Sequence, residues 1–185
     1  MKNIKISIIL SLLFGLFFTF LNSGEAQPLF PYLEEGQVRP GTHAPKITHS
    51  FAVEKGYYGY ILKIYIEADD PDGDMTLIAT EINRVGNGRY PTDWVVVKPQ
   101  YQKHFKGYLQ LNTFDFRKPS EWTYITLKVS VIDKTRNVSN VVVFPFTFES
   151  GIGDPYKYSL PAPFAKEDPK LGHIFIFPSG GRSGN

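Results

Sequence analysis

The chain has 185 residues, 42% of them hydrophobic, with 20 basic and 18 acidic side chains and a formal net charge of +2. A chain this close to neutrality, without a run of basic residues, lacks the basic surface that binding to nucleic acid or anionic lipid requires. Cysteine is absent, which excludes disulfides, thiolate metal sites, cysteine nucleophiles and lipoprotein acylation.

Residues 1–26 have the pattern of a secretory signal peptide. A lysine-containing start precedes an apolar run from Ile6 to Leu21, and small residues come just before Gln27. The run is shorter than the roughly 20 apolar residues that span a bilayer, so we expect export with cleavage before Gln27 rather than a membrane anchor. No second long apolar run follows in the sequence. The mature chain is therefore predicted to be secreted, in the periplasm or outside the cell, without a membrane span.

The mature chain divides by composition into three parts, residues 27–44, 45–149 and 150–185. Residues 27–44 are rich in proline and glycine without apolar periodicity, which predicts an N-terminal linker. Residues 45–149 consist of short segments in which apolar and polar residues alternate, as expected for half-buried strands. The strands predicted from this alternation are 60–68, 75–83, 94–98, 105–114, 124–133 and 141–148. The sequence Val85-Gly86-Asn87-Gly88 predicts a hairpin turn, because Asn-Gly tolerates positive φ angles.

Three of these segments predict which side chains face the core. The apolar faces are Leu62, Ile64, Ile66 and Ala68; then Ile125, Leu127, Val129 and Val131; then Val142, Phe144, Phe146 and Phe148. The opposite face of the first segment carries Ile61, Lys63, Tyr65 and Glu67. Because Pro145 cannot donate a ladder hydrogen bond, the last strand should be an edge strand or bulged there. About seven such strands predict an all-β fold, a single antiparallel β-sandwich with extended N- and C-terminal segments.

Residues 150–185 form a proline- and glycine-rich C-terminal tail that contains one short β-prone run, 171–177. An apolar strand on a proline-rich tether should pair with a sheet edge rather than remain in water. Two outcomes are open, because the strand could fold back onto its own domain or be donated to a partner protein.

Two passages carry a resemblance to a known family. Residues 66–74 (Ile-Glu-Ala-Asp-Asp-Pro-Asp-Gly-Asp) are similar to the acidic turn after the second strand of bacterial extracellular immunoglobulin-like domains of the cadherin and fibronectin type III kind. Residues 129–140 (Val-Ser-Val-Ile-Asp-Lys-Thr-Arg-Asn-Val-Ser-Asn) resemble the penultimate strand of such domains and its turn. Arg136 stands where those domains usually have glycine. The resemblance implies an Ig-like sandwich, a fold that hosts many unrelated functions.

The acidic turn is the candidate metal site. Its carboxylates, Asp69, Asp70, Asp72 and Asp74, are hard oxygen ligands of the kind that Ca²⁺ prefers. In the cadherin kind, the resemblance implies Ca²⁺ binding by the pair matched here by Asp70 and Asp72, together with a neighbouring domain. The alternative is a turn in which aspartates bond their own backbone and glycine supplies positive φ. Asp133 and Asn137 form a second polar loop, which bears on this site if the fold brings both loops to one end.

Aromatic side chains offer a second ligand class, because exposed rings can stack on sugars, although sandwich cores also use them. The aromatics considered for this role are Tyr57, Tyr58, Tyr60, Tyr90, Trp94, Tyr101 and Tyr108. Catalytic motifs are sparse, since the four histidines form no zinc-binding spacing and no nucleophile elbow is present.

The sequence therefore predicts an exported, non-enzymatic Ig-like binding or structural module of the bacterial envelope or extracellular space. Its partner would be another envelope or extracellular protein, reached through strand 171–177. The alternative is a Ca²⁺-dependent or carbohydrate-binding module that uses the Asp69–Asp74 loop or surface aromatics. No other cofactor is expected.

Overall fold

The computed structural model describes residues 38–53, 55–57, 61–84, 88–90, 92, 94–112, 124–149 and 158–175. Every described residue belongs to one compact unit, Tyr32–Asn185. The predicted signal peptide and residues 27–37 of the linker lie outside the described residues. The described part of the chain contains no helix with the length and hydropathy of a membrane span.

The described residues form ten strands and one turn of 3-10 helix. The elements are β1 (Lys46–Ala52), β2 (Lys55–Tyr57), β3 (Ile61–Asp69), β4 (Met75–Arg84), β5 (Gly88–Tyr90), β6 (Val95–Val96), η2 (Pro99–Tyr101), β7 (His104–Asn112), β8 (Tyr124–Asp133), β9 (Val142–Glu149) and β10 (Lys170–Ile174).

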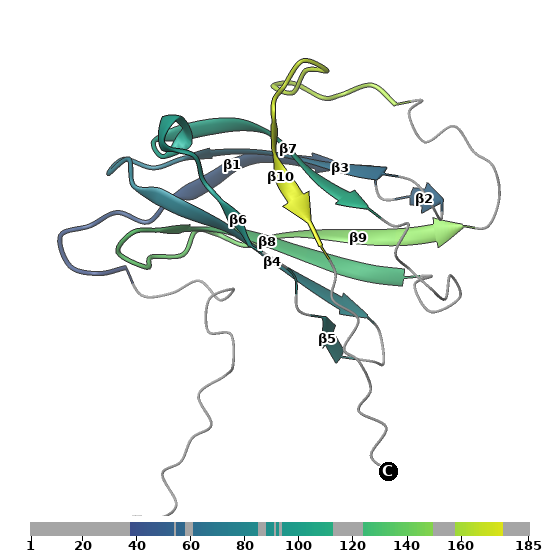
Figure 1. The fold of residues 1–185 in the computed structure, drawn as a ribbon, viewed down its shortest axis with the longest axis horizontal. Coiled ribbons are helices and arrows are strands. Elements are labelled where there is room, and N and C mark those ends of the chain that lie inside the picture. Colours follow the sequence, from purple (N-terminus) through teal and green to yellow (C-terminus); the bar gives the residue numbers. More distant parts are fainter. Residues whose placement is uncertain are drawn as a thin grey trace, which may run out of the picture. The chain divides into compact units, whose positions relative to one another are not determined.

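The strands form two sheets (Figure 1). One has the order β1-β3-β7-β10, and the other has the order β2-β9-β8-β4-β5, with β6 also paired to β4. Strands β1, β3 and β7 correspond to A, B and E of an immunoglobulin-like sandwich, and β4, β8 and β9 correspond to C, F and G. The fold is therefore the predicted all-β, Ig-like antiparallel sandwich. The C-terminal strand β10 occupies the position of strand D and runs parallel to β7.

The predicted apolar faces meet between the sheets. The fully buried side chains of β3, Ile64, Ile66 and Ala68, lie in one cluster with those of β8 and with Phe144, Phe146 and Phe148 of β9. A cluster of this size is the main source of stability in a domain without disulfides. Tyr65, on the face predicted to be outward, is also buried, with 2% of its surface exposed. Residues 158–164 explain this, because the rings of Tyr158 and Phe164 lie against that face.

Several predicted boundaries differ from the structure. Strands β1, β2 and β5 were not among the predicted strands. Of the predicted strand 94–98, Val95 and Val96 form β6, which pairs with β4. The β4–β5 hairpin forms around residues 85–87, but the predicted Asn-Gly turn itself lies outside the described residues. At Pro145, β9 pairs with β8 only, because β2 pairs with β9 at Thr147–Glu149. Pro145 therefore lies on a part of β9 that is an edge of the sheet, where proline is tolerated.

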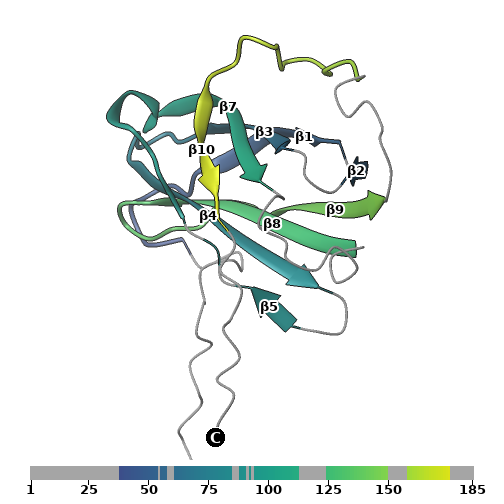
Figure 2. The same cartoon turned by 45° about the vertical axis from the view of Figure 1, so that its right-hand side comes forward.

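The C-terminal run forms a strand, as predicted. β10 lies beside β7 in both views (Figures 1 and 2), with Lys170 opposite Tyr108 and Ile174 opposite Leu111. In this chain β10 pairs with its own β7, and donation to a partner protein stays a prediction. Residues 176 and 177 of the predicted strand lie outside the described residues.

Candidate functional site

The loop between β3 and β4 is organised by Asp70, which has 2% of its surface exposed. Its Oδ1 accepts the N–H of Asp72 at 3.1 Å, and its Oδ2 accepts the N–H of Asp74 at 3.0 Å. The carbonyl of Asp70 accepts the N–H of Gly73, which has φ +73°. This is an aspartate turn that satisfies its own backbone donors, with glycine at the position that needs positive φ.

Asp72 joins this loop to the segment before β1. Its Oδ2 accepts the N–H of His43 at 2.6 Å, and its Oδ1 lies 2.8 Å from Nδ1 of the same histidine. This side-chain hydrogen bond raises the pKa of His43 above 6.5 and lowers the pKa of Asp72 below 3.8. Both side chains are solvated, so the pair adds a weak, pH-dependent attachment.

The second polar loop follows β8 and is centred on Asn137, which is 1% exposed. Asp133 accepts the Asn137 backbone N–H and its Nδ2, each at 2.7 Å. The same Nδ2 lies 2.9 Å from Oγ1 of Thr42, and Oδ1 of Asn137 accepts the N–H of Arg39 at 3.0 Å. Residues 39–43 of the predicted linker are thus hydrogen-bonded to both polar loops.

Arg136 has φ +70° within this second loop. Positive φ is the conformation that glycine adopts without cost and that other residues adopt at about 1–2 kcal/mol. Arg136 therefore holds a backbone conformation that glycine would adopt without strain.

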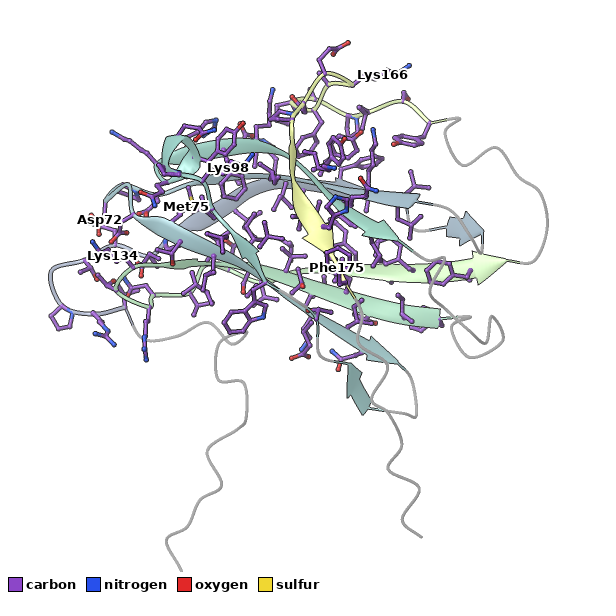
Figure 3. All side chains as sticks on the ribbon, in the orientation of Figure 1. Asp72, Met75, Lys98, Lys134, Lys166 and Phe175 are labelled. Carbon is purple, nitrogen blue, oxygen red and sulfur yellow. The ribbon has the colours of Figure 1, made fainter. Side chains whose placement is uncertain are left out.

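The two loops meet at one end of the sandwich, where Asp72 and Lys134 are labelled (Figure 3). The N–H of Lys134 donates to the carbonyl of Asp74 at 2.9 Å. Oδ1 of Asp74 is buried and has no hydrogen-bond partner among the described residues. Burial raises the pKa of Asp74 above 3.8, and the nearby carboxylates of Asp70 and Asp133 add to the shift.

The four predicted ligands do not converge on one point. Asp70, Asp72 and Asp74 share the loop, whereas Asp69 ends β3 and its Oδ1 lies 2.8 Å from Nδ1 of His104. In the part of the chain that the structure describes, no group of three or more histidine, aspartate or glutamate side chains is placed to hold a metal ion. The hydrogen bonding is that of the turn alternative, and Ca²⁺ binding stays a prediction.

The aromatics considered as a sugar platform pack against the protein where their side chains are described. Tyr101 packs against the main core cluster, and Trp94 packs against a smaller cluster that contains Ala79 and Ile132. The ring of Tyr108 lies 5.6 Å from that of Tyr65. The side chains of Tyr57, Tyr58, Tyr60 and Tyr90 lie outside the described set.

Two of the four histidines, which the sequence scatters, lie beside carboxylates on neighbouring strands. Nδ1 of His49 lies 2.7 Å from Oε2 of Glu67, its register partner across β1 and β3. His104 is opposite Asp69 in the β3–β7 register. These are cross-strand polar pairs of the kind that stabilise sheets.

The chain has little similarity to known proteins. No protein-family model matches the chain, and no curated protein matches it. Among solved structures, the chain is similar to the PKD domain of an M14-like peptidase from Thermoplasmatales archaeon SCGC AB-540-F20, with 17% identity and a TM-score of 0.40. The match covers 58% of this chain and 97% of that domain. The assignment of the Ig-like fold above follows from the strand order.

Proposed function

We propose that the chain is an exported, non-enzymatic Ig-like module of the bacterial envelope or extracellular space, which binds another protein through its surface. The observation that carries the proposal is an Ig-like sandwich preceded in the sequence by a signal-peptide pattern. The Ig-like fold hosts many unrelated functions, so the fold alone does not define one. The cadherin or fibronectin type III kind is proposed on the turns at residues 66–74 and 129–140.

The polar residues of the candidate site support a non-enzymatic role. Asp70 and Asp133 are buried and accept backbone N–H groups of their own loops. The buried Asn137 accepts the N–H of Arg39 from the segment before β1. A catalytic acid or base needs a group that can reach a substrate. These side chains instead hold the loops and the segment before β1 in place.

Export is tested by expressing the full chain in a Gram-negative bacterium and fractionating the cells. We expect a mature protein in the periplasm or medium whose first residue is Gln27. The matched control is Leu13→Arg, which interrupts the apolar run and should leave uncleaved chain in the cytoplasm. Cytoplasmic, uncleaved wild-type protein would overturn the proposal.

A Ca²⁺-dependent module is the second candidate, and the buried Oδ1 of Asp74 favours it. An unpartnered carboxylate oxygen is a potential ligand for a hard cation, whereas the neighbouring Asp70 and Asp133 are already hydrogen-bonded to backbone N–H groups. Calorimetry with Ca²⁺ should then give heat for the wild type and for Asp69→Asn, whose side chain bonds His104, but none for Asp74→Asn. No heat from the wild type retires this candidate, and an empty glycan array retires the carbohydrate alternative.

A further inference from the structure

Residues 158–175, called here the C-terminal segment, lie on a surface shaped to receive them. The N–H of Tyr108 donates to the carbonyl of Pro169 at 3.0 Å, and β10 continues the pairing along β7. Without this segment, β7 would be the exposed edge of the four-stranded sheet. An exposed edge is a template for pairing with another strand.

Two glycines make the close fit possible. A Cβ on Gly107 would lie 2.4 Å from the carbonyl oxygen of Pro169, and a Cβ on Gly172 would lie 2.4 Å from Cγ1 of Val95. Glycine inside a strand commonly marks a close approach of another backbone. Gly107 therefore opens β7 to the segment, and Gly172 lets the segment pass β6.

Side chains on the outer face of the sheet hold the segment as well. The ring of Phe164, 7% exposed, lies 5.5 Å from the ring of Tyr65. Nζ of Lys106 donates to the carbonyl of Pro163 at 3.0 Å and lies 3.5 Å from Oδ1 of Asp168. The receiving surface thus consists of the β7 edge, the outer face of β3 and β7, and Val95 of β6.

The body of the sandwich depends little on which chain supplies the segment. Among the described residues, Ile174 is the one fully buried member of the main core cluster that the segment contributes. The contacts given above join the segment to β3, β6 and β7, and Tyr158 adds a ring contact to Phe51 of β1. The eight residues 150–157, which link β9 to the segment, can span at most about 29 Å when fully extended.

We propose that the receiving surface also accepts the C-terminal segment of a second copy of this chain, so that two copies exchange segments. An exchanged segment makes the same contacts in the partner as in its own chain, which makes exchange of a terminal element a low-cost route to a dimer. Exchange in both directions leaves no β7 edge exposed. This inference rests on the proposed function as a surface-binding module and names a second copy as its partner.

The occupant is a second copy because the fit is specific to this sequence. The receiving surface requires a carboxylate opposite Lys106, an aromatic ring opposite Tyr65 and a glycine opposite Val95. Asp168, Phe164 and Gly172 supply these in the chain itself. A generic apolar strand would meet the β7 edge but would lack this combination.

The absence of cysteine allows a direct test. Gln110 and His173 are register partners across β7 and β10, and partners on adjacent strands, about 4.8 Å apart, lie within the range of a disulfide. Two mature single variants, Gln110→Cys and His173→Cys, are mixed at high concentration and then oxidised. We expect a mixed disulfide with twice the monomer mass, in a yield that rises with protein concentration before oxidation.

The controls separate this inference from the proposed function. The double variant Gln110→Cys/His173→Cys should form an internal disulfide at low concentration, which shows that the geometry permits the bond. A mixture of Gln110→Cys with Lys134→Cys, at the opposite end of the sandwich, measures random cross-linking. If the double variant closes internally and the mixed pair forms no more dimer than the Lys134→Cys control, exchange is refuted, whereas export and cleavage at Gln27 are unaffected.

Discussion

The close approach of the C-terminal segment to β7 predicts that a single methyl group will disturb it. Gly107→Ala would place Cβ 2.4 Å from the carbonyl oxygen of Pro169 and 2.8 Å from Cγ of Leu171. The first neighbour is backbone, so it cannot move away by a side-chain rotation. Either β7 and the segment shift apart, or the segment leaves its position.

Either outcome lowers the free energy of unfolding by an amount that can be approximated. Overpacking of this kind costs about 1–3 kcal/mol. Release of the segment would expose Ile174, which is 1% exposed when docked, and re-exposing one such side chain costs about 1.5–3 kcal/mol. Gly to Ala in an unstrained position would instead stabilise by about 0.4–1 kcal/mol. We therefore expect Gly107→Ala to lower the free energy of unfolding by about 2 kcal/mol.

Urea unfolding of the mature chain, followed by tryptophan fluorescence, measures this difference. Gln110→Ala is the matched control, because it lies on the same strand, is partly exposed, and should change stability by less than about 0.5 kcal/mol. Limited proteolysis of Gly107→Ala should also cut within residues 158–175 faster than in the wild type. A Gly107→Ala variant as stable as the wild type would refute the docking geometry.

Three further predictions concern the polar end of the sandwich. Arg136→Gly should raise the free energy of unfolding by about 0.5–1 kcal/mol, because glycine adopts the positive φ of 70° without strain. The control Thr135→Gly should lower the free energy of unfolding. Equal effects of the two variants in urea titrations would contradict the prediction. Asp74→Asn should stabilise the protein by about 1 kcal/mol at pH 7 and have little effect near pH 3. A carboxyl whose folded pKa is raised makes the protein less stable as the pH rises from 3.8 through that pKa. A stabilisation by Asp74→Asn that does not change with pH would therefore count against the burial of Asp74. His43→Ala should slightly destabilise the protein between about pH 4 and 6.5, where Asp72 is ionised and His43 is protonated. The loss of stability should become smaller as the pH rises through the folded pKa of His43. Thermal melts across this pH range measure the effect, and a larger loss at pH 9 would contradict the prediction.

The strands that sequence alternation predicted are those buried on one face by the opposite sheet. In β3 and β8, every second residue enters the core, so the period-two pattern is uninterrupted. Strand β1 escaped prediction because its register shifts between Ile47 and His49, and a bulge of this kind breaks the alternation. Tyr65 was assigned to the outward face, and it is buried because the distant C-terminal segment covers that face.

The candidate site was predictable only where it is local. The turn formed by Asp70 and Gly73 follows from residue preferences within five positions. The partners of Asp72 and Asn137 do not, because His43 and Thr42 come from a proline- and glycine-rich stretch 29 and 95 residues away in sequence. Likewise, the apolar run after the tether predicted a strand, but neither its direction nor its choice of the β7 edge was determined by the run itself.

The central claim is that the C-terminal strand completes the four-stranded sheet by pairing with β7. Amide hydrogen exchange of the mature protein, read by NMR, tests it most directly. We predict slow exchange for the N–H of Tyr108, which donates to Pro169, and for ladder amides of β10, comparable with those between β3 and β7. Exchange of these amides at the rate of an unfolded chain, while the β3 amides stay protected, would contradict the claim.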